Sequence, residues 1–159
     1  MMKANSKASN SNASTKLIKR IITSPQVYRP VGPYSQAVLA DRTLYVSGVL
    51  GLDQSSNMIC GVEGQARCAL NNLKLILEAG DSSLRAVVKT TILLACIEDL
   101  QVVNPIYAEF FPQEHPARAA YQVARLPLNA CIEIEAVALS GEVEISDGTS
   151  CPCARQPYC

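Results

Sequence analysis

Two segments with helical periodicity lie between runs of strand-like residues, and their order along the chain restricts the folds it can adopt. Apolar residues recur every three or four positions from Gly61 to Ala79 and again over Asp99–Phe111, so both segments are predicted to be amphipathic helices. Strands are predicted over Leu17–Thr23, Ser35–Ala40, Thr43–Ser47, Val87–Ala95, Ala117–Ala124 and Cys131–Leu139. The order is three strands, a helix, a strand, a helix and two strands.

This order favours an α+β fold. A hairpin at Asp41–Arg42 opens the chain, and a second hairpin is predicted to close it, because only a short link separates the last two strands. We therefore predict a mixed β-sheet with both helices packed on one face. The other face carries Ala, Cys and Val residues, and the sequence offers no third layer to cover them. Self-association is the expected cover.

The 159 residues suit one domain, which we place at 17–145. Residues 1–16 are rich in Ser, Asn and Lys, and residues 146–159 combine Gly, Pro and cysteines, so both tails are predicted to be disordered. The first 40 residues contain six Lys or Arg and no Asp or Glu. We interpret this basic start as a solvated tail, with organelle targeting as the alternative. The remainder is mildly acidic, which argues against nucleic acid as the main partner.

Cysteine and histidine usage excludes several classes of site. Seven cysteines without the spacing of a disulfide framework indicate a reducing compartment, so we expect a cytoplasmic protein, with mitochondria as the alternative. The single histidine excludes a His-based metal cluster, and no phosphate-binding loop, dinucleotide turn or EF-hand loop occurs. Cys151 and Cys153 have no second pair at zinc-ligand spacing, so no metal is predicted. No apolar run reaches the roughly 18 residues of a membrane span.

Arg118 opens an apolar strand, where a guanidinium is costly unless it is paired. Its planar fork suits a carboxylate, which it can hold through two parallel hydrogen bonds. The alternative is an edge-strand arginine that reaches solvent or pairs with a structural acid. The residue taken alone does not decide between these two roles.

Glu133 and Tyr34 are the other two candidates. Period-two alternation places Glu133 on a mixed face of the last strand, opposite a core face. It is either an ordinary solvated residue or, in a cleft, a group that orients a water and takes its proton. The turn at Gly32-Pro33 presents Tyr34 rigidly, for packing or as the wall of a pocket. The short link between the last two strands permits an antiparallel pair that carries Arg118 and Glu133.

Five blocks of the sequence, taken in order, resemble the reactive intermediate deaminase (Rid) family in its RidA-like branch. The blocks are GPYSQAV (32–38), ADRTLYVSG (40–48), VVKTTILLA (87–95), PARAAYQVARLP (116–127) and IEIEAVA (132–138). Each block is modestly specific, whereas the ordered set is strong and covers nearly the whole predicted domain. The resemblance implies a chorismate-mutase-like α+β subunit that forms a homotrimer with active sites between subunits.

The resemblance also implies an activity, the hydrolysis of reactive 2-imino acids such as 2-iminopropanoate and 2-iminobutanoate to 2-keto acids and ammonia. It implies that Arg118 holds the substrate carboxylate, that Glu133 positions the attacking water, and that no cofactor or metal takes part. The other implied substrate contacts are Tyr34, Ser47, Asn104 and the backbone of Ala120. The implied partners are this small substrate and further subunits of the same chain, with no membrane.

Three residues depart from the family pattern. Val49 stands where many relatives have glutamine, which loses an amide beside the pocket, and His115 stands where phenylalanine is frequent. Pro105 lies inside a predicted helix, where it is expected to kink or restart the helix and turn Asn104 into a helix cap. Two alternatives to the deaminase follow: a diverged, non-catalytic protein with a binding or chaperone-like role, and a ribonuclease that inhibits translation.

Overall fold

A computed structural model describes residues 16–146. Every predicted helix and strand is present, with small changes at the ends. The strands are β1 (Lys19–Ile22), β2 (Ala37–Ala40), β3 (Thr43–Leu50), β4 (Val87–Leu94), β5 (Ala117–Gln122) and β6 (Ile132–Leu139). The helices are α1 (Gly61–Ala79) and α2 (Leu100–Phe110), and short 3₁₀ turns occur at Leu84–Ala86, Ile97–Asp99 and Pro127–Asn129. The two predicted tails lie outside the described residues, apart from Lys16 and Ser146.

The strands form one sheet in the order β1-β2-β3-β6-β4-β5. The predicted closing hairpin is wrong: β6 lies between β3 and β4 and is antiparallel to both, whereas β5 is at the edge, parallel to β4. The reason is the connection through α2, because a helix that joins two neighbouring strands returns the chain in the parallel sense. The inward residues of β6 are at most 3% exposed, which suits a central strand; they are Ile132, Ile134, Ala136 and Ala138.

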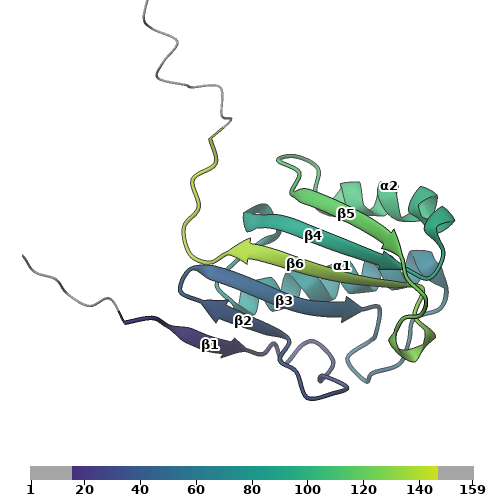
Figure 1. Ribbon diagram of the computed structural model, residues 1–159, viewed down its shortest axis with the longest axis horizontal. Helices are drawn as coiled ribbons and strands as arrows, with labels where there is room; N and C mark the ends of the chain where they lie inside the picture. The colour runs from purple at the N-terminus through teal and green to yellow at the C-terminus, as the bar shows by residue number, and fades with distance from the viewer. Residues whose placement is uncertain (1–15, 147–159) are drawn as a thin grey trace, which may run out of the picture.

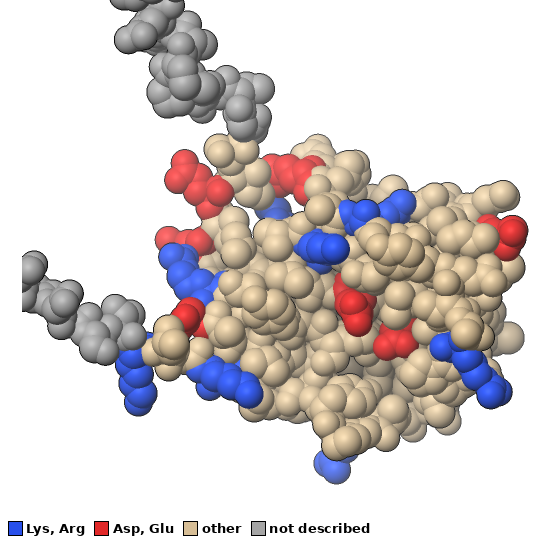
Figure 2. All heavy atoms as spheres, in the orientation of Figure 1, with Lys and Arg blue, Asp and Glu red and all other residues tan. Residues whose placement is uncertain are grey.

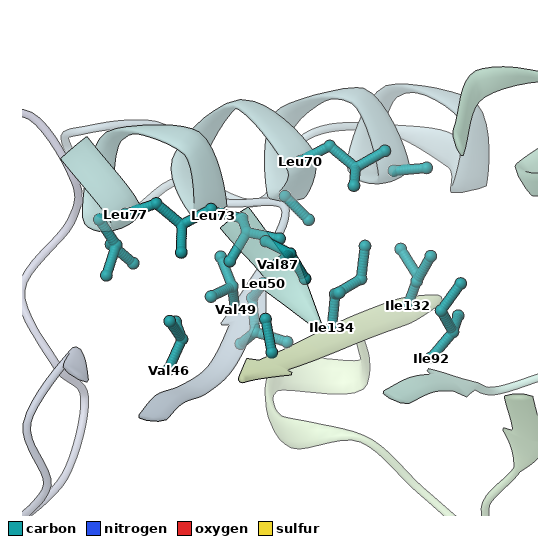
Figure 3. Close-up of a cluster of buried hydrophobic side chains, with 14 of the residues drawn as sticks. Val46, Val49, Leu50, Leu70, Leu73, Leu77, Val87, Ile92, Ile132 and Ile134 are labelled. Carbon is teal, nitrogen blue, oxygen red and sulfur yellow. The ribbon is translucent and has the colours of Figure 1, made fainter. Parts of the chain in front are cut away.

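Both helices cover the same face of the sheet, as predicted, and lie behind it in Figure 1. Helix α1 packs on β3 and β6, and its apolar stripe meets the inward side chains of those strands (Figure 3). Leu70, Leu73 and Leu77 on this stripe are fully buried. Burial of each such side chain contributes roughly 1.5–3 kcal/mol, so this interface supplies much of the free energy of folding.

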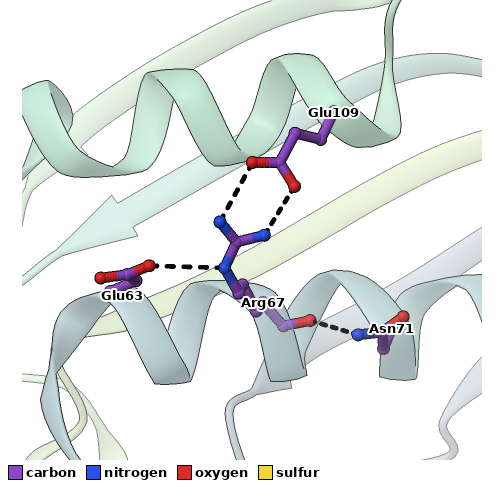
Figure 4. A network of polar contacts seen from close by, with 4 residues as sticks. All are labelled: Glu63, Arg67, Asn71 and Glu109. Atoms are coloured by element: carbon purple, nitrogen blue, oxygen red, sulfur yellow. Dashed lines mark hydrogen bonds and ion pairs between the residues drawn. The ribbon is translucent and has the colours of Figure 1, made fainter.

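An ion-pair cluster joins the two helices at the surface. The guanidinium of Arg67 on α1 donates to both carboxylate oxygens of Glu109 on α2, at 2.6 and 3.0 Å, and lies 3.5 Å from Glu63 (Figure 4). All of these side chains are substantially exposed, so solvent screens the pair and its main effect is to fix the relative position of the helices.

Helix α2 continues through Pro105, so the predicted restart is wrong, and Asn104 is an interior helical residue rather than a cap. Proline removes one backbone donor from the helix. The helix persists because a 3₁₀ turn feeds directly into its first residue and because Val103, Ile106 and Tyr107 are buried against the rest of the protein. Tertiary packing therefore overrides the local cost of the proline.

The face of the sheet away from the helices is uncovered. Figure 2 shows this face toward the viewer, with uncharged atoms over most of it and two acidic groups near its middle. Large apolar side chains stand on it, among them Tyr45 and Tyr121, each more than half exposed. Within the described residues, the four cysteines are free thiols and no helix is long and apolar enough to cross a membrane.

Candidate active site

The residues that the resemblance singled out fall into two clusters. We call Arg118, Asn104 and Ala120 the Arg118 cluster, and Glu133, Ser47 and Tyr34 the Glu133 cluster. The first lies where the edge strand β5 meets α2. The second lies over β3 and β6 on the side of the uncovered face.

The Arg118 cluster surrounds a hollow of about 350 Å³. Its lining residues are Asn104, Tyr107, Ala108, His115, Pro116 and Arg118. Arg118 and Ala120 alternate along β5 toward the helix side, and Asn104 and Tyr107 are three positions apart on α2 and so point to the same side of that helix. A helix face and a strand edge thus bring the predicted carboxylate-binding arginine and a polar amide into one hollow.

Arg118 differs from other arginines of the protein in its partner. Arg67 and Arg85 each donate two hydrogen bonds to a glutamate carboxylate. Arg118 has no hydrogen bond or ion pair within residues 16–146; instead its guanidinium carbon lies 4.8 Å from the centroid of the Tyr107 ring. A contact with an aromatic face uses none of the N–H donors in a conventional hydrogen bond, so the fork is free to bind an anion.

Glu133 lies on β6 with its side chain across β3, directly over Gly48. A Cβ atom built at Gly48 would overlap Oε1 of Glu133, so only glycine leaves room for the carboxylate in this position. Burial raises the pKa of Glu133 above its usual value, and the nearby charge of Glu135 raises it further. A half-buried carboxylate with a raised pKa is a stronger proton acceptor than an exposed one, which suits a general base.

Replacement of Gly48 with alanine should therefore displace the Glu133 carboxylate and lower kcat for the activity proposed below by roughly 10- to 100-fold, because small errors in the position of a catalytic group have large effects. Steady-state kinetics on Gly48→Ala and on the double variant Gly48→Ala/Glu133→Gln test whether the effect acts through Glu133. In protein that already carries Glu133→Gln, Gly48→Ala should lower kcat little further. Fully additive losses would contradict it.

Ser47 and Tyr34 are connected through the 32–36 segment. Ser47 precedes Gly48 on β3 and donates its hydroxyl to the backbone oxygen of Ser35 at 2.7 Å, which ties the 32–36 segment to the sheet. Tyr34 is 41% exposed, and its hydroxyl accepts a hydrogen bond from the Val31 amide. The neighbouring Tyr28 accepts from the Leu50 amide at 2.8 Å, and burial raises the pKa of Tyr28 to about 12. Tyr28 is therefore a neutral phenol within the core.

The two clusters do not meet within one subunit. Arg118 is paired with Thr90 of β4, whereas Glu133 is paired with Leu93, three residues further along the same strand. Thr90 faces the helices, since its hydroxyl contacts Tyr107 of α2. Because side chains alternate along a strand, Leu93 and Glu133 face the opposite side. Arg118 and Glu133 therefore lie on opposite faces of the sheet.

Of the residues that depart from the family pattern, Val49 lies in the core and His115 lies at the Arg118 hollow. Val49 is 2% exposed and packs in the core, so its side chain lines neither cluster, and the expected loss of an amide beside the pocket is wrong (Figure 3). His115 lines the Arg118 hollow. Within residues 16–146 no group of three His, Cys, Asp or Glu side chains is placed to hold a metal ion.

Sequence reasoning missed two residues of the site. Tyr107 falls within the predicted helix Asp99–Phe111 but was not singled out, and Gly48 appears only as the last residue of a matching block. The spacing of Asn104 and Tyr107 was the available signal for the first, since residues three apart share a helix face. Only the strand register reveals the second, because it brings Glu133 beside β3.

The fold is that of a small α+β protein, with a mixed sheet and both helices on one face. The Rid fold belongs to this class. A model of the family described as endoribonuclease L-PSP matches residues 24–140. The chain is 51% identical over 127 residues to human 2-iminobutanoate/2-iminopropanoate deaminase, across 79% of this chain and 93% of that protein. It is 44% identical over 133 residues to Arabidopsis thaliana Reactive Intermediate Deaminase A, chloroplastic, across 82% and 71% of the two chains.

The fold gives the same relationship. The crystal structure of RidA from the Antarctic bacterium Psychrobacter superimposes with a TM-score of 0.74 at 37% identity, over 76% of this chain and 98% of that one. The chain therefore belongs to the endoribonuclease L-PSP family, and within it to the Rid proteins that its sequence resembles.

Proposed function

We propose that this protein is a deaminase that hydrolyses reactive 2-imino acids, such as 2-iminopropanoate and 2-iminobutanoate, to 2-keto acids and ammonia. The observation that carries the proposal is the identity of 51% to the human deaminase across 93% of that protein's length. The Arg118 cluster supports it independently, since a guanidinium without an acid partner fits the carboxylate that every 2-imino acid carries.

In the proposed complex the guanidinium of Arg118 holds the substrate carboxylate, and this fixes the adjacent imine carbon. Asn104 supplies a further polar contact from the same hollow, and the backbone of Ala120 supplies another from β5. The free imine already reacts with water, so the protein gains rate mainly by orienting the two reactants and by stabilising the charge that develops.

Glu133 supplies the water side of the proposed reaction. Its carboxylate takes one proton from a water molecule whose oxygen bonds to the imine carbon. That proton passes to the imine nitrogen and gives a carbinolamine. The proton of its hydroxyl group then moves to the nitrogen, the carbon–nitrogen bond breaks as the carbonyl forms, and ammonia and the keto acid leave. Ser47, next to Gly48 on β3, and Tyr34, in the segment that Ser47 holds, supply the further substrate contacts that the family resemblance implies. Only water is consumed, so the reaction needs no cofactor.

The proposed sites form between subunits of a homotrimer. Arg118 and Glu133 lie on opposite faces of one sheet, so a substrate that touches both must take them from two different chains. If each pair of neighbouring subunits is joined by two different patches, the interface is heterologous and generates a ring when its rotation closes, and three subunits form the smallest such ring. The uncovered sheet face with Tyr45 and Tyr121 supplies apolar area for this contact.

The test is a coupled assay in which a serine or threonine dehydratase generates the imine in the presence of the purified full chain. The protein should accelerate the release of ammonia in proportion to its concentration, without added cofactor. An unchanged rate at all protein concentrations would contradict the proposal.

The ribonuclease in the family's description has weaker support. The chain has one histidine, so it has no pair of histidines for acid–base cleavage of RNA. The exposed sheet face is mostly uncharged rather than basic (Figure 2). We therefore propose no nucleic-acid substrate.

A further inference from the structure

The side chain of Tyr107 on α2 is held by two specific contacts as well as by burial. It is 5% exposed, and its ring stacks on Phe111 with centroids 4.5 Å apart and planes at 29°. Its hydroxyl lies 2.8 Å from the hydroxyl of Thr90, a fully buried residue of β4. The stacking restrains the plane of the ring, and the hydrogen bond restrains the position of its hydroxyl end.

The same ring also faces Arg118. The guanidinium carbon is 4.8 Å from the ring centroid, within the range of a cation–π contact. Burial raises the pKa of Tyr107, while the hydrogen bond with Thr90 and the charge of Arg118 act in the other direction. The phenol is neutral at physiological pH, so Arg118 meets the face of a neutral ring rather than a phenolate that would compete with the substrate.

Arg118 needs such a support because nothing else within the described residues restrains it. It stands on an edge strand, its side chain is exposed, and it has no hydrogen-bonding partner within residues 16–146. A free arginine side chain loses conformational entropy when it is fixed by a ligand. A carboxylate partner would fix it in advance but would also occupy its donors, as Glu109 does for Arg67. An aromatic face fixes the cation and leaves the donors free.

We propose that Tyr107 is a positioning residue that preorders Arg118 for the substrate carboxylate. The inference rests on the proposed function. It predicts a contribution to substrate binding through the ring and not through the hydroxyl, because the cation lies over the ring face. The chain of contacts runs from buried Thr90 through Tyr107 to Arg118, and so links the core to the anion site.

The experiment compares Tyr107→Leu with Tyr107→Phe in the full chain. A cation–π contact contributes about 0.5–2 kcal/mol, so Tyr107→Leu should raise both KM for the imine and the Kd of the product 2-oxobutanoate by roughly 2- to 30-fold, with a small change in kcat. Tyr107→Phe keeps the ring and should stay within about twofold of the wild type. Ile106→Ala, at the next buried position of α2, controls for lost helix packing: it should lower the melting temperature without changing Kd.

Equal loss of binding in the leucine and phenylalanine variants, or unchanged Kd in Tyr107→Leu, would overturn the inference. The Kd of 2-oxobutanoate, measured by calorimetry, also separates this inference from the proposed function. A wild-type protein that binds 2-oxobutanoate but does not accelerate imine hydrolysis would contradict the function, while the comparison of the Tyr107 variants would still decide the positioning role. A wild-type protein that binds no keto acid would overturn both.

Discussion

Replacement of Arg118 with alanine should lower kcat/KM for imine hydrolysis by roughly 30- to 150-fold, because it removes a charge-assisted bidentate bond worth about 2–3 kcal/mol. Most of the loss should appear in KM, since the carboxylate is bound in both the ground state and the transition state. Arg118→Lys should recover only part of the activity, because an ammonium keeps the charge but not the planar fork. The coupled dehydratase assay measures all three proteins.

The matched control is Arg20→Ala. Arg20 is an exposed arginine on β1, at the opposite edge of the sheet, and its removal changes the net charge by the same amount. Its kinetics should equal those of the wild type. Full activity in Arg118→Ala, or an equal loss in both variants, would exclude Arg118 as the carboxylate anchor.

Replacement of Glu133 with glutamine should lower kcat roughly 100-fold or more with little change in KM, because the amide keeps the shape of the side chain but cannot accept the proton of the water. The raised pKa of Glu133 also sets the pH dependence. The carboxylate is protonated as the pH falls through its pKa. The acid limb of the kcat profile should therefore have its midpoint at a higher pH than the usual pKa of a glutamate.

The control for Glu133 is Glu135→Gln, two residues away on the same face and exposed. Because the charge of Glu135 helps to raise the pKa of Glu133, this variant should keep its activity and move the acid limb to lower pH. The melting temperature of Glu133→Gln should not fall at neutral pH, because a carboxyl with a raised pKa destabilises the folded protein when it is ionised. An acid limb that is identical in the wild type and Glu135→Gln would contradict this assignment.

Local patterns were sufficient for the elements and insufficient for their arrangement. The alternation in β6 predicts its core face correctly, since Ile132 and Ile134 are fully buried. The position of β6 between β3 and β4 depends on how α2 returns the chain, and no local pattern records that. A short link was read as a hairpin, although its length also allows the chain to cross one strand. The continuity of α2 through Pro105 similarly depends on tertiary burial.

The candidate site was predictable as a set of residues and not as a geometry. The ordered blocks singled out Arg118 and Glu133 through the roles that the family resemblance implies for them. Their placement on opposite faces follows from the register of β4 with β5 and β6, which requires the structure. The ring of Tyr107 beneath Arg118 is likewise a contact between a helix and a strand that are distant in sequence.

Complementation between two inactive variants tests whether one site takes Arg118 from one subunit and Glu133 from another. Arg118→Ala and Glu133→Gln subunits would be unfolded, mixed in equal amounts and refolded together, with each variant refolded alone as the reference. Random assembly into rings should restore about one quarter of the wild-type number of sites, since each site then has an even chance of receiving each intact residue. Activity in the mixture no higher than the average of the two separate variants would contradict the account.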